Sequence, residues 1–251
     1  MALEFSIFTA VSDMATGTLF DDPDVADQPP LEIPASAFTP GGFRDWSFSA
    51  SFPEGVRATL VGGNILIDMN SERFNTHNFV KLEVTSVIYM LAKSQHLGMT
   101  AADGALITNE AIGLSNEPDG CFVSWDSLRA KRVRLVRSET GNKAESWEGA
   151  PDWVMEVVSD SSVKKDTVIL MESYHQAGIR EYWVIDARKL DIDFNIYAWQ
   201  ESGYVAQPRT GGWVASPVFG CSFSLQRRMI EEYLNYELRM SANTTSLERT
   251  E

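Results

Sequence analysis

The sequence predicts a mixed α/β protein, an α+β arrangement in which parallel and antiparallel strands share a sheet. Residues 153–158 and 181–186 are almost unbroken apolar runs, which is typical of strands buried on both faces. Residues 166–177, between them, have a helical pattern that ends at Gly178. A crossover of this length joins parallel strands through a right-handed connection. An antiparallel meander is expected to follow, at residues 192–199, 204–206, 213–215 and 219–225.

The region before this unit contains further strand and helix patterns. Residues 59–68 resemble a strand that a glycine pair interrupts, so we expect a turn or bulge there. A helix is expected from a cap at Asn75 or Thr76 to the stretch 96–98, because apolar residues recur at helical spacing between them. Shorter strands are expected at residues 104–108, 121–124 and 133–137.

We expect the chain to be organised in three segments. Residues 1–55 contain an acidic, proline-bearing stretch and then a run rich in Gly, Phe and Ser, which indicates an extended N-terminal arm. Residues 56–228 are expected to form one domain, because a chain of 251 residues with 44% hydrophobic residues can bury a substantial core. Residues 229–251 begin with a helical pattern and end in a polar tail.

The chain is acidic, with 21 Lys and Arg against 35 Asp and Glu and a formal net charge of −14. This argues against a protein that coats nucleic acid non-specifically, because phosphate binding needs clustered basic residues. It does not argue against a nuclease, because a local basic strip or a bound divalent cation can dominate a cleft. A solvated hairpin face is the alternative interpretation of the strip found here, which consists of Arg129, Lys131, Arg132, Arg134 and Arg137.

Cysteine usage and hydropathy favour a soluble, cytoplasmic protein. Cys121 and Cys221 have no Cys or His at ligand spacing, which indicates neither a zinc site nor a disulfide framework. The N-terminus lacks a basic start, and no segment approaches about 18 uncharged apolar residues. Neither secretion nor membrane association is therefore expected.

Three acidic residues stand where burial is expected. Asp119 enters an apolar strand, and Glu156 lies inside a buried strand. Glu83 borders the apolar face of the helix expected between Asn75 and residues 96–98. A buried carboxylate needs a cation or a hydrogen-bond donor as its partner. Mg²⁺ binds one or two carboxylates with water and a substrate phosphate, and water polarised in this way can attack phosphorus. The sequence has no His pair, Gly-Lys-Ser loop, Gly-x-Ser-x-Gly elbow or zinc-protease helix, so those reaction classes are disfavoured.

Several short motifs occur in an order that is specific in combination. They are Asn-Glu-Pro-Asp-Gly at 116–120, Pro-Asp-Trp-Val-Met-Glu-Val-Val-Ser at 151–159, Lys-Lys-Asp at 164–166 and Tyr-His-Gln-Ala-Gly-Ile-Arg-Glu-Tyr-Trp-Val-Ile-Asp at 174–186. With them, residues 55–226 resemble the Uma-type restriction endonucleases of the PD-(D/E)XK nuclease superfamily. The resemblance implies a restriction-endonuclease-like core, in which helices flank a mixed central sheet and metal-binding carboxylates lie on adjacent central strands.

The resemblance also implies roles for the acidic residues. Asp119 matches the Pro-Asp aspartate and Glu156 the acidic residue of the next core strand, so both are expected to bind Mg²⁺ or Mn²⁺. Glu83 matches an acidic residue of the first helix that acts as an auxiliary ligand or positions water. Asp152 begins the strand that carries Glu156, so we interpret it as a turn or capping residue at the far end of that strand. A turn residue, a buried ion pair and a helix-surface residue are the alternatives for Asp119, Glu156 and Glu83.

The lysine of the superfamily pattern is absent from its usual place. Val158 stands where that lysine would follow the acid, and Leu170 where Uma-type sequences often have a lysine on the next helix. Lys164 and Lys165 open this helix, and Lys165 is the one we expect to orient the attacking water or stabilise charge on the phosphate. A solvated helix-start position is the alternative for Lys165.

These observations together predict a metal-dependent endonuclease that hydrolyses phosphodiester bonds in DNA, with Asp119, Glu156, Lys165 and Glu83 as its site. The alternative is a nuclease-fold protein without catalysis that serves as a binding or assembly module, which the missing lysine and the acidic charge favour. Hydrolysis of a smaller phosphoester is a third hypothesis. By analogy with related cores, which often pair, we also expect a homodimer.

Overall fold

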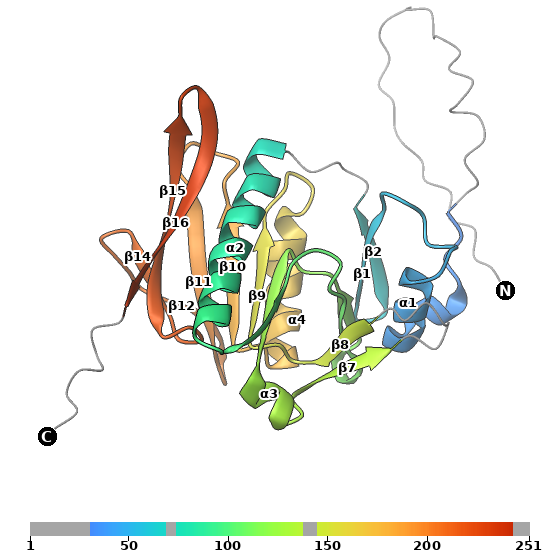
Figure 1. The fold of residues 1–251 in the computed structure, drawn as a ribbon. Coiled ribbons are helices and arrows are strands. Elements are labelled where there is room, and N and C mark those ends of the chain that lie inside the picture. The colour runs from blue at the N-terminus through green and yellow to red at the C-terminus, as the bar shows by residue number, and fades with distance from the viewer. Residues whose placement is uncertain (1–30, 69–73, 138–144, 243–251) are drawn as a thin grey trace, which may run out of the picture.

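The computed structural model describes residues 31–68, 74–137 and 145–242 of the chain (Figure 1). The expected α+β class is confirmed, because mixed and antiparallel sheets are combined with helices. The helices, including short 3-10 and π segments marked η, are η1 (Ala35–Phe38), α1 (Pro40–Ser47), η2 (Phe74–Asn78), α2 (Phe79–Ser94), η3 (Glu110–Ile112), α3 (Trp125–Arg129), η4 (Lys165–Ile169) and α4 (Leu170–Ala177).

The central sheet contains the strand–helix–strand unit expected from the sequence. Its strands, in spatial order, are β12 (Gly203–Ala206), β11 (Asp193–Gln200), β10 (Glu181–Asp186), β9 (Trp153–Val157), β6 (Gly120–Ser124) and β3 (Gly98–Ala101). β9 and β10 pair in parallel, as predicted, while β6 and β11 pair antiparallel on either side of them. Residues 98–101 were not expected to form a strand.

The other sheets lie on either side of the central one. One of them has the order β2 (Asn64–Asp68), β1 (Arg57–Val61), β5 (Leu114–Asn116), β4 (Ile107–Asn109), β8 (Glu145–Gly149) and β7 (Val133–Arg137). The glycine pair between β1 and β2 makes the expected turn, with positive φ at both glycines. The remaining sheet has the order β13 (Arg209–Thr210), β14 (Trp213–Ser216), β15 (Cys221–Ile230) and β16 (Tyr233–Ala242).

The two faces of the central sheet pack against different helices (Figure 1). Along β9, Trp153 and Met155 pack with the apolar side of α2 and with the β15–β16 hairpin. Val154 points to the opposite face, where the apolar side of α4 covers it. Glu156 is two residues beyond Val154, so its side chain points to the same face of the sheet, toward α4. This alternation directs a single acidic side chain toward α4 from within an apolar strand.

The expectation that residues 1–55 form an extended N-terminal arm is wrong for the part of this range that the structure describes. Residues 1–30 lie outside the described residues, but η1 and α1 are helical. Thr39 caps α1 by accepting a hydrogen bond from the Gly42 backbone N–H at 3.3 Å, and Pro40 follows at the first helical position. Phe43 and Trp46 are then buried in a small core beside β1 and β4.

The helix expected at the start of residues 229–251 is also wrong. Tyr236 and Leu238 are buried and alternate with more exposed residues, so the pattern has the period of a strand. This segment forms β16, which pairs along its whole length with β15. The polar tail, residues 243–251, lies outside the described residues.

Two remaining expectations concern cysteines and membrane spans. Cys121 and Cys221 are free and buried, and they lie in different core clusters. None of the helices in the described ranges has the length and apolar content that a membrane span requires.

Candidate active site

The pairing of β6 with β9 brings Asp119 beside Glu156. Gly120 pairs with Met155 in an antiparallel register, so the next pair outward is Asp119 with Glu156. Asp119 Oδ2 accepts a hydrogen bond from the Val157 backbone N–H at 2.7 Å, which fixes its carboxylate against β9. Both acidic residues are only 3% exposed. Two carboxyl groups that are 37 positions apart in the sequence therefore share one buried location.

Asp119 is surrounded by basic side chains. His77 Nε2 lies 3.2 Å from its Oδ2, while Lys81 Nζ and Arg57 Nη1 lie 3.4 Å and 3.6 Å from its Oδ1. Burial alone would raise the pKa of Asp119, but the contacts from His77 and Lys81 and the Val157 N–H lower it below its ordinary value. These contacts therefore favour the ionised form of Asp119.

Glu156 has the opposite electrostatic environment. Its Oε1 accepts hydrogen bonds from Asn116 Nδ2 at 3.0 Å and from the Tyr174 hydroxyl at 2.7 Å. Burial raises the pKa of Glu156 well above its ordinary value; the Lys165 charge lowers it in part and the Asp119 charge raises it further. The site thus pairs one carboxyl group whose pKa is lowered with one whose pKa is raised.

Lys165 and Asp166 reach the same location from the start of η4. Burial would lower the pKa of Lys165, but the negative charges of Glu156 and Asp166 raise it, so the ammonium form is retained. Lys165 Nζ lies 3.6 Å from Asp166 Oδ1, and burial raises the pKa of Asp166 to about 6. Asp166 Oδ2 accepts a hydrogen bond from Ser162, whereas its buried Oδ1 has no hydrogen-bond partner among the described residues. η4 therefore adds an ammonium and a third carboxyl group to the site.

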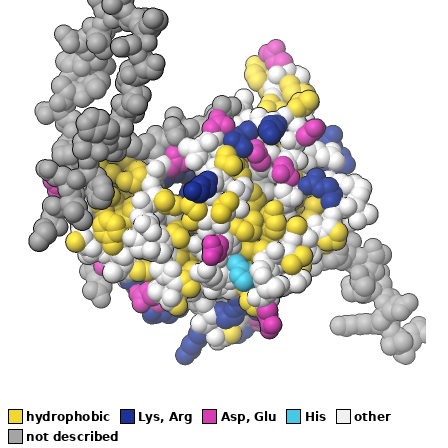
Figure 2. Space-filling view, turned by 180° about the vertical axis from the view of Figure 1, so that it is seen from behind, with side chains coloured by type: hydrophobic (Ala, Val, Ile, Leu, Met, Phe, Trp, Pro, Cys, Tyr) yellow, Lys and Arg dark blue, Asp and Glu magenta, His cyan; other side chains and the backbone are white. Residues whose placement is uncertain are grey.

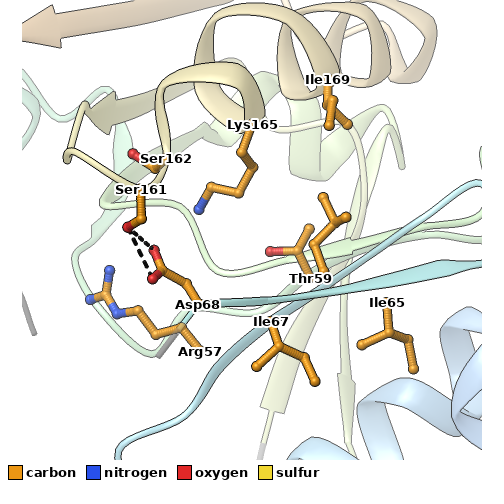
Figure 3. Close-up of a pocket in the computed structure, with 10 residues that line it drawn as sticks. Arg57, Thr59, Ile65, Ile67, Asp68, Ser161, Ser162, Lys165 and Ile169 are labelled. Atoms are coloured by element: carbon orange, nitrogen blue, oxygen red, sulfur yellow. Dashed lines mark hydrogen bonds between the residues drawn. The ribbon is translucent and has the colours of Figure 1, made fainter. Parts of the chain in front are cut away.

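These side chains line a small cavity of about 20 Å³. Its walls are formed by Arg57, Asp68, His77, Asp119, Glu156, Val157, Ser159, Ser162, Lys165 and Asp166. A space of this volume holds one water-sized occupant and is too small for a nucleotide. It opens beside a larger groove of about 530 Å³, which shares Arg57, Asp68, Ser162 and Lys165 with it (Figure 3).

The donor set of the cavity fits a hard divalent cation such as Mg²⁺ or Mn²⁺. Asp119 and Glu156 supply carboxylate oxygens, and the cavity volume of about 20 Å³ matches a single small occupant. No group of three or more His, Cys, Asp or Glu side chains is arranged to hold a metal ion by itself in the described part of the chain.

The structure brings together three of the residues predicted from the sequence and leaves one elsewhere. Asp119, Glu156 and Lys165 line the same cavity, but Glu83 does not. Glu83 Oε1 instead accepts a hydrogen bond from the Leu238 backbone N–H of β16 at 2.8 Å. Glu83 follows Lys81 by two residues on α2, which turns it about 200° around the helix axis, away from Asp119. The expected role of Glu83 as auxiliary ligand is therefore not supported by its position.

Asp152 lies at the other end of β9, as expected. Its oxygens accept hydrogen bonds from the Ser124 backbone N–H, the Ser127 hydroxyl and Arg180 Nη1, at 2.7, 2.7 and 2.9 Å. These contacts tie the start of β9 to α3 and to the start of β10. Asp152 thus has a structural position, as expected, but its hydrogen bonds link separate elements rather than close a turn or cap a helix.

The basic strip also lies away from the cavity. Arg132 Nη2 donates to the Gly178 carbonyl, at the C-terminal end of α4, whereas Lys165 lies at the start of η4. η4 and α4 together span residues 165–177, which places these ends about 20 Å apart. Arg129 and Arg134 form ion pairs with Asp126 and Glu148. Basic and acidic side chains are also interspersed on the face shown in Figure 2.

Sequence reasoning missed most of the residues that surround the two carboxyl groups. His77 and Lys81 are four residues apart, so they share one side of the helical segment, and this spacing could have indicated a common target. Arg57 is on β1 and Asn116 on β5, and no local pattern connects either of them to Asp119 or Glu156.

The chain is similar to a known protein family and to solved structures. A crystal structure of a "putative nuclease belonging to DUF820" from Anabaena variabilis ATCC 29413 is similar to the chain, with 21% identity, coverage of 64% of this chain and 82% of that chain, and a TM-score of 0.49. No curated protein matches the chain. The family model described as "Uma2: Putative restriction endonuclease" matches residues 42–228, which is well over half of the chain. The chain therefore belongs to the Uma2 family of restriction-endonuclease-like proteins.

Proposed function

We propose that the protein is a metal-dependent endonuclease that hydrolyses phosphodiester bonds in DNA. The observation that carries the proposal is the convergence of Asp119, Glu156 and Lys165 on one cavity sized for a small cation. Membership of the Uma2 family supports the class of reaction. A divalent cation bound there would polarise water and neutralise charge on the phosphate.

Each residue of the cavity has a part in this proposal that follows from its environment. Asp119 is kept ionised by His77 and Lys81, so it offers a carboxylate ready to bind a cation. Glu156 is held in place by Asn116 and Tyr174 and would bind a cation after losing its proton.

Lys165 supplies the positive charge that the missing superfamily lysine would otherwise provide. Its side chain is 20% exposed and lines both the cavity and the adjacent groove. From there it can donate to a phosphate oxygen on which negative charge develops. A preorganised donor of this kind contributes roughly 100-fold or more to the rate.

The test is cleavage of a supercoiled plasmid and of matched DNA and RNA oligonucleotides with Mg²⁺ or Mn²⁺. Wild type should nick DNA, and Asp119→Asn, Glu156→Gln and Lys165→Met should each reduce the rate by about 100-fold or more. Lys164→Met and Glu172→Gln are matched controls, because both residues are exposed and do not line the cavity. Cleavage by wild type that does not exceed that of Asp119→Asn would overturn the proposal. Preference for the RNA oligonucleotide would overturn the assignment to DNA.

The homodimer and the cytoplasmic location predicted from the sequence stay predictions. Light scattering of the full chain tests the first, and a particle of monomer mass would contradict it.

A further inference from the structure

The groove beside the cavity carries cationic and hydroxyl side chains from separate parts of the chain. Arg57 comes from β1, Lys165 from η4 and Ser161 from the segment between β9 and η4. Figure 3 shows Lys165 and Arg57 on either side of Asp68, whose carboxylate points at Ser161. The groove has a volume of about 530 Å³, large enough for part of a nucleotide chain, whereas the cavity beside it is not.

Asp68 is held in this groove in the manner of a bound oxyanion. The Ser161 hydroxyl lies 3.0 and 3.1 Å from its two carboxylate oxygens, so one hydroxyl serves both. Asp68 is the cross-strand partner of Arg57 in the β1–β2 hairpin, so the two side chains share one face of it. The Asp68 charge is also among those that raise the pKa of Lys165. A carboxylate of this chain thus occupies a place that a hydroxyl, an ammonium and a guanidinium surround.

A phosphodiester has the same charge as a carboxylate and presents its oxygens to the same donors. Arg57 already contacts Asp103 and Asp119 at 3.5 and 3.6 Å, but its guanidinium has five N–H groups and its side chain is 44% exposed. It can therefore keep these contacts and donate to a further anion. Since Arg57, Asp68 and Lys165 line both spaces, an anion in the groove would lie directly beside the cavity.

We propose that this groove is a phosphate subsite, in which Arg57, Ser161 and Lys165 bind a backbone phosphate of the substrate and Asp68 is the internal anion that this phosphate displaces. The proposal rests on the proposed function for its choice of a nucleic-acid phosphate. It adds that Asp68 opposes substrate binding. The alternative is that the hydrogen bond from Ser161 to Asp68 only joins β2 to the segment after β9.

The sign of one substitution separates these two interpretations. Asp68→Asn removes the competing charge and keeps the shape, so the subsite predicts tighter DNA binding, by about tenfold. A purely structural contact predicts no gain. Asp160→Asn is the matched control, because it removes the same charge next to Ser161 from a residue that does not line the groove. Ser161→Ala should weaken binding by about tenfold, since it removes a donor to a charged acceptor.

The assay is fluorescence anisotropy of a labelled DNA duplex with the full chain, in EDTA so that no cleavage occurs, and a thermal melt confirms that each variant is folded. Tightening by Asp68→Asn but not by Asp160→Asn supports the subsite. Equal effects of the two variants, or unchanged affinity in Ser161→Ala, overturn it. A parallel titration with inorganic phosphate identifies the source of the anion: if Asp68→Asn gains affinity for phosphate but not for DNA, the assignment to backbone phosphate is wrong.

Failure of this proposal can be told apart from failure of the proposed function. If Asp68→Asn tightens DNA binding but wild type does not cleave DNA with Mg²⁺ or Mn²⁺, the subsite stands and the endonuclease assignment falls. If wild type cleaves DNA and the binding of Asp68→Asn matches that of Asp160→Asn, the subsite falls and the endonuclease assignment stands.

Discussion

Binding of a divalent cation to the cavity should release one proton, and Glu156→Gln should abolish both the binding and the release. The two carboxyl groups begin from opposite states, because the pKa of Asp119 is lowered and that of Glu156 is raised well above its ordinary value. Glu156 is therefore the group that we expect to hold a proton in the metal-free site and to lose it when Mn²⁺ binds. The expected proton count is one, rather than zero or two.

The size of the effect follows from this count. Release of one proton makes the apparent association constant of Mn²⁺ rise about tenfold for each pH unit below the pKa of Glu156. Asp166 has a pKa of about 6, so it is ionised above pH 7 and adds nothing to the slope there. At about 100 times the dissociation constant, Mn²⁺ should stabilise the fold by about 2.7 kcal/mol. For a chain of this size that raises Tm by roughly 5–10 °C.

The measurement is isothermal titration calorimetry with Mn²⁺ from pH 7 upward, in pairs of buffers with different ionisation enthalpies. The difference in heat between the two buffers counts the protons released. Glu156→Gln keeps the shape of the side chain and removes its capacity for negative charge, so it should fold normally and show neither Mn²⁺ heat nor a rise in Tm. Glu172→Gln, an exposed change on α4, should behave as wild type. A proton count of zero or two, or Mn²⁺ binding by Glu156→Gln, would refute the reasoning.

Three further predictions concern carboxylates outside the cavity. Burial raises the pKa of Glu181 to about 7 from an ordinary 4.5, so the native state holds the proton more tightly and about 3 kcal/mol of stability is lost as pH rises from about 4.5 through 7. Urea unfolding at pH 5 and pH 8 should show that Glu181→Gln lacks this loss, and an identical loss in wild type and variant would contradict it. Asp152→Ala should cost about 2–4 kcal/mol of unfolding free energy, because it leaves three donors without their acceptor, yet leave Mn²⁺ affinity unchanged. A change in Mn²⁺ affinity in that variant would mean that the two ends of β9 are coupled. Glu83→Ala should cost about 1–2 kcal/mol by freeing the Leu238 N–H, also without a change in Mn²⁺ heat, and loss of that heat would restore Glu83 as a ligand.

The elements whose signals are local could be predicted well. The apolar runs of β9 and β10 and the helix between them appear in the structure with bounds close to those expected, and the parallel pairing follows from the length of that crossover. The failures occurred where tertiary pairing decided the outcome. Residues 233–242 form a strand because β15, which directly precedes them in the chain, offers an edge with which they pair along their whole length.

The candidate site was predictable only where its residues stand in local sequence patterns. Asp119 and Glu156 stand in short motifs that can be recognised one at a time, and Lys165 begins a helix whose start is visible in the sequence. The partners of these residues come from α2, β1 and β5, and no periodicity along the chain relates those elements to β9. For Glu83, the sequence correctly predicted a position beside the apolar face of α2. It did not predict that the side chain points to the Leu238 backbone N–H of β16 instead of the cavity.

The sequence by itself determined the strand–helix–strand unit of β9, α4 and β10 and which acidic residues enter apolar strands, because both depend on neighbours along the chain. Only the tertiary structure decided the electrostatic environment of each carboxyl group. The pKa of Asp119 is lowered because His77 and Lys81 lie within 4 Å of it, whereas burial on the α4 face of the sheet raises the pKa of Glu156. Charge states depend on distances of a few ångströms between elements and on exclusion of water, and a linear pattern contains neither.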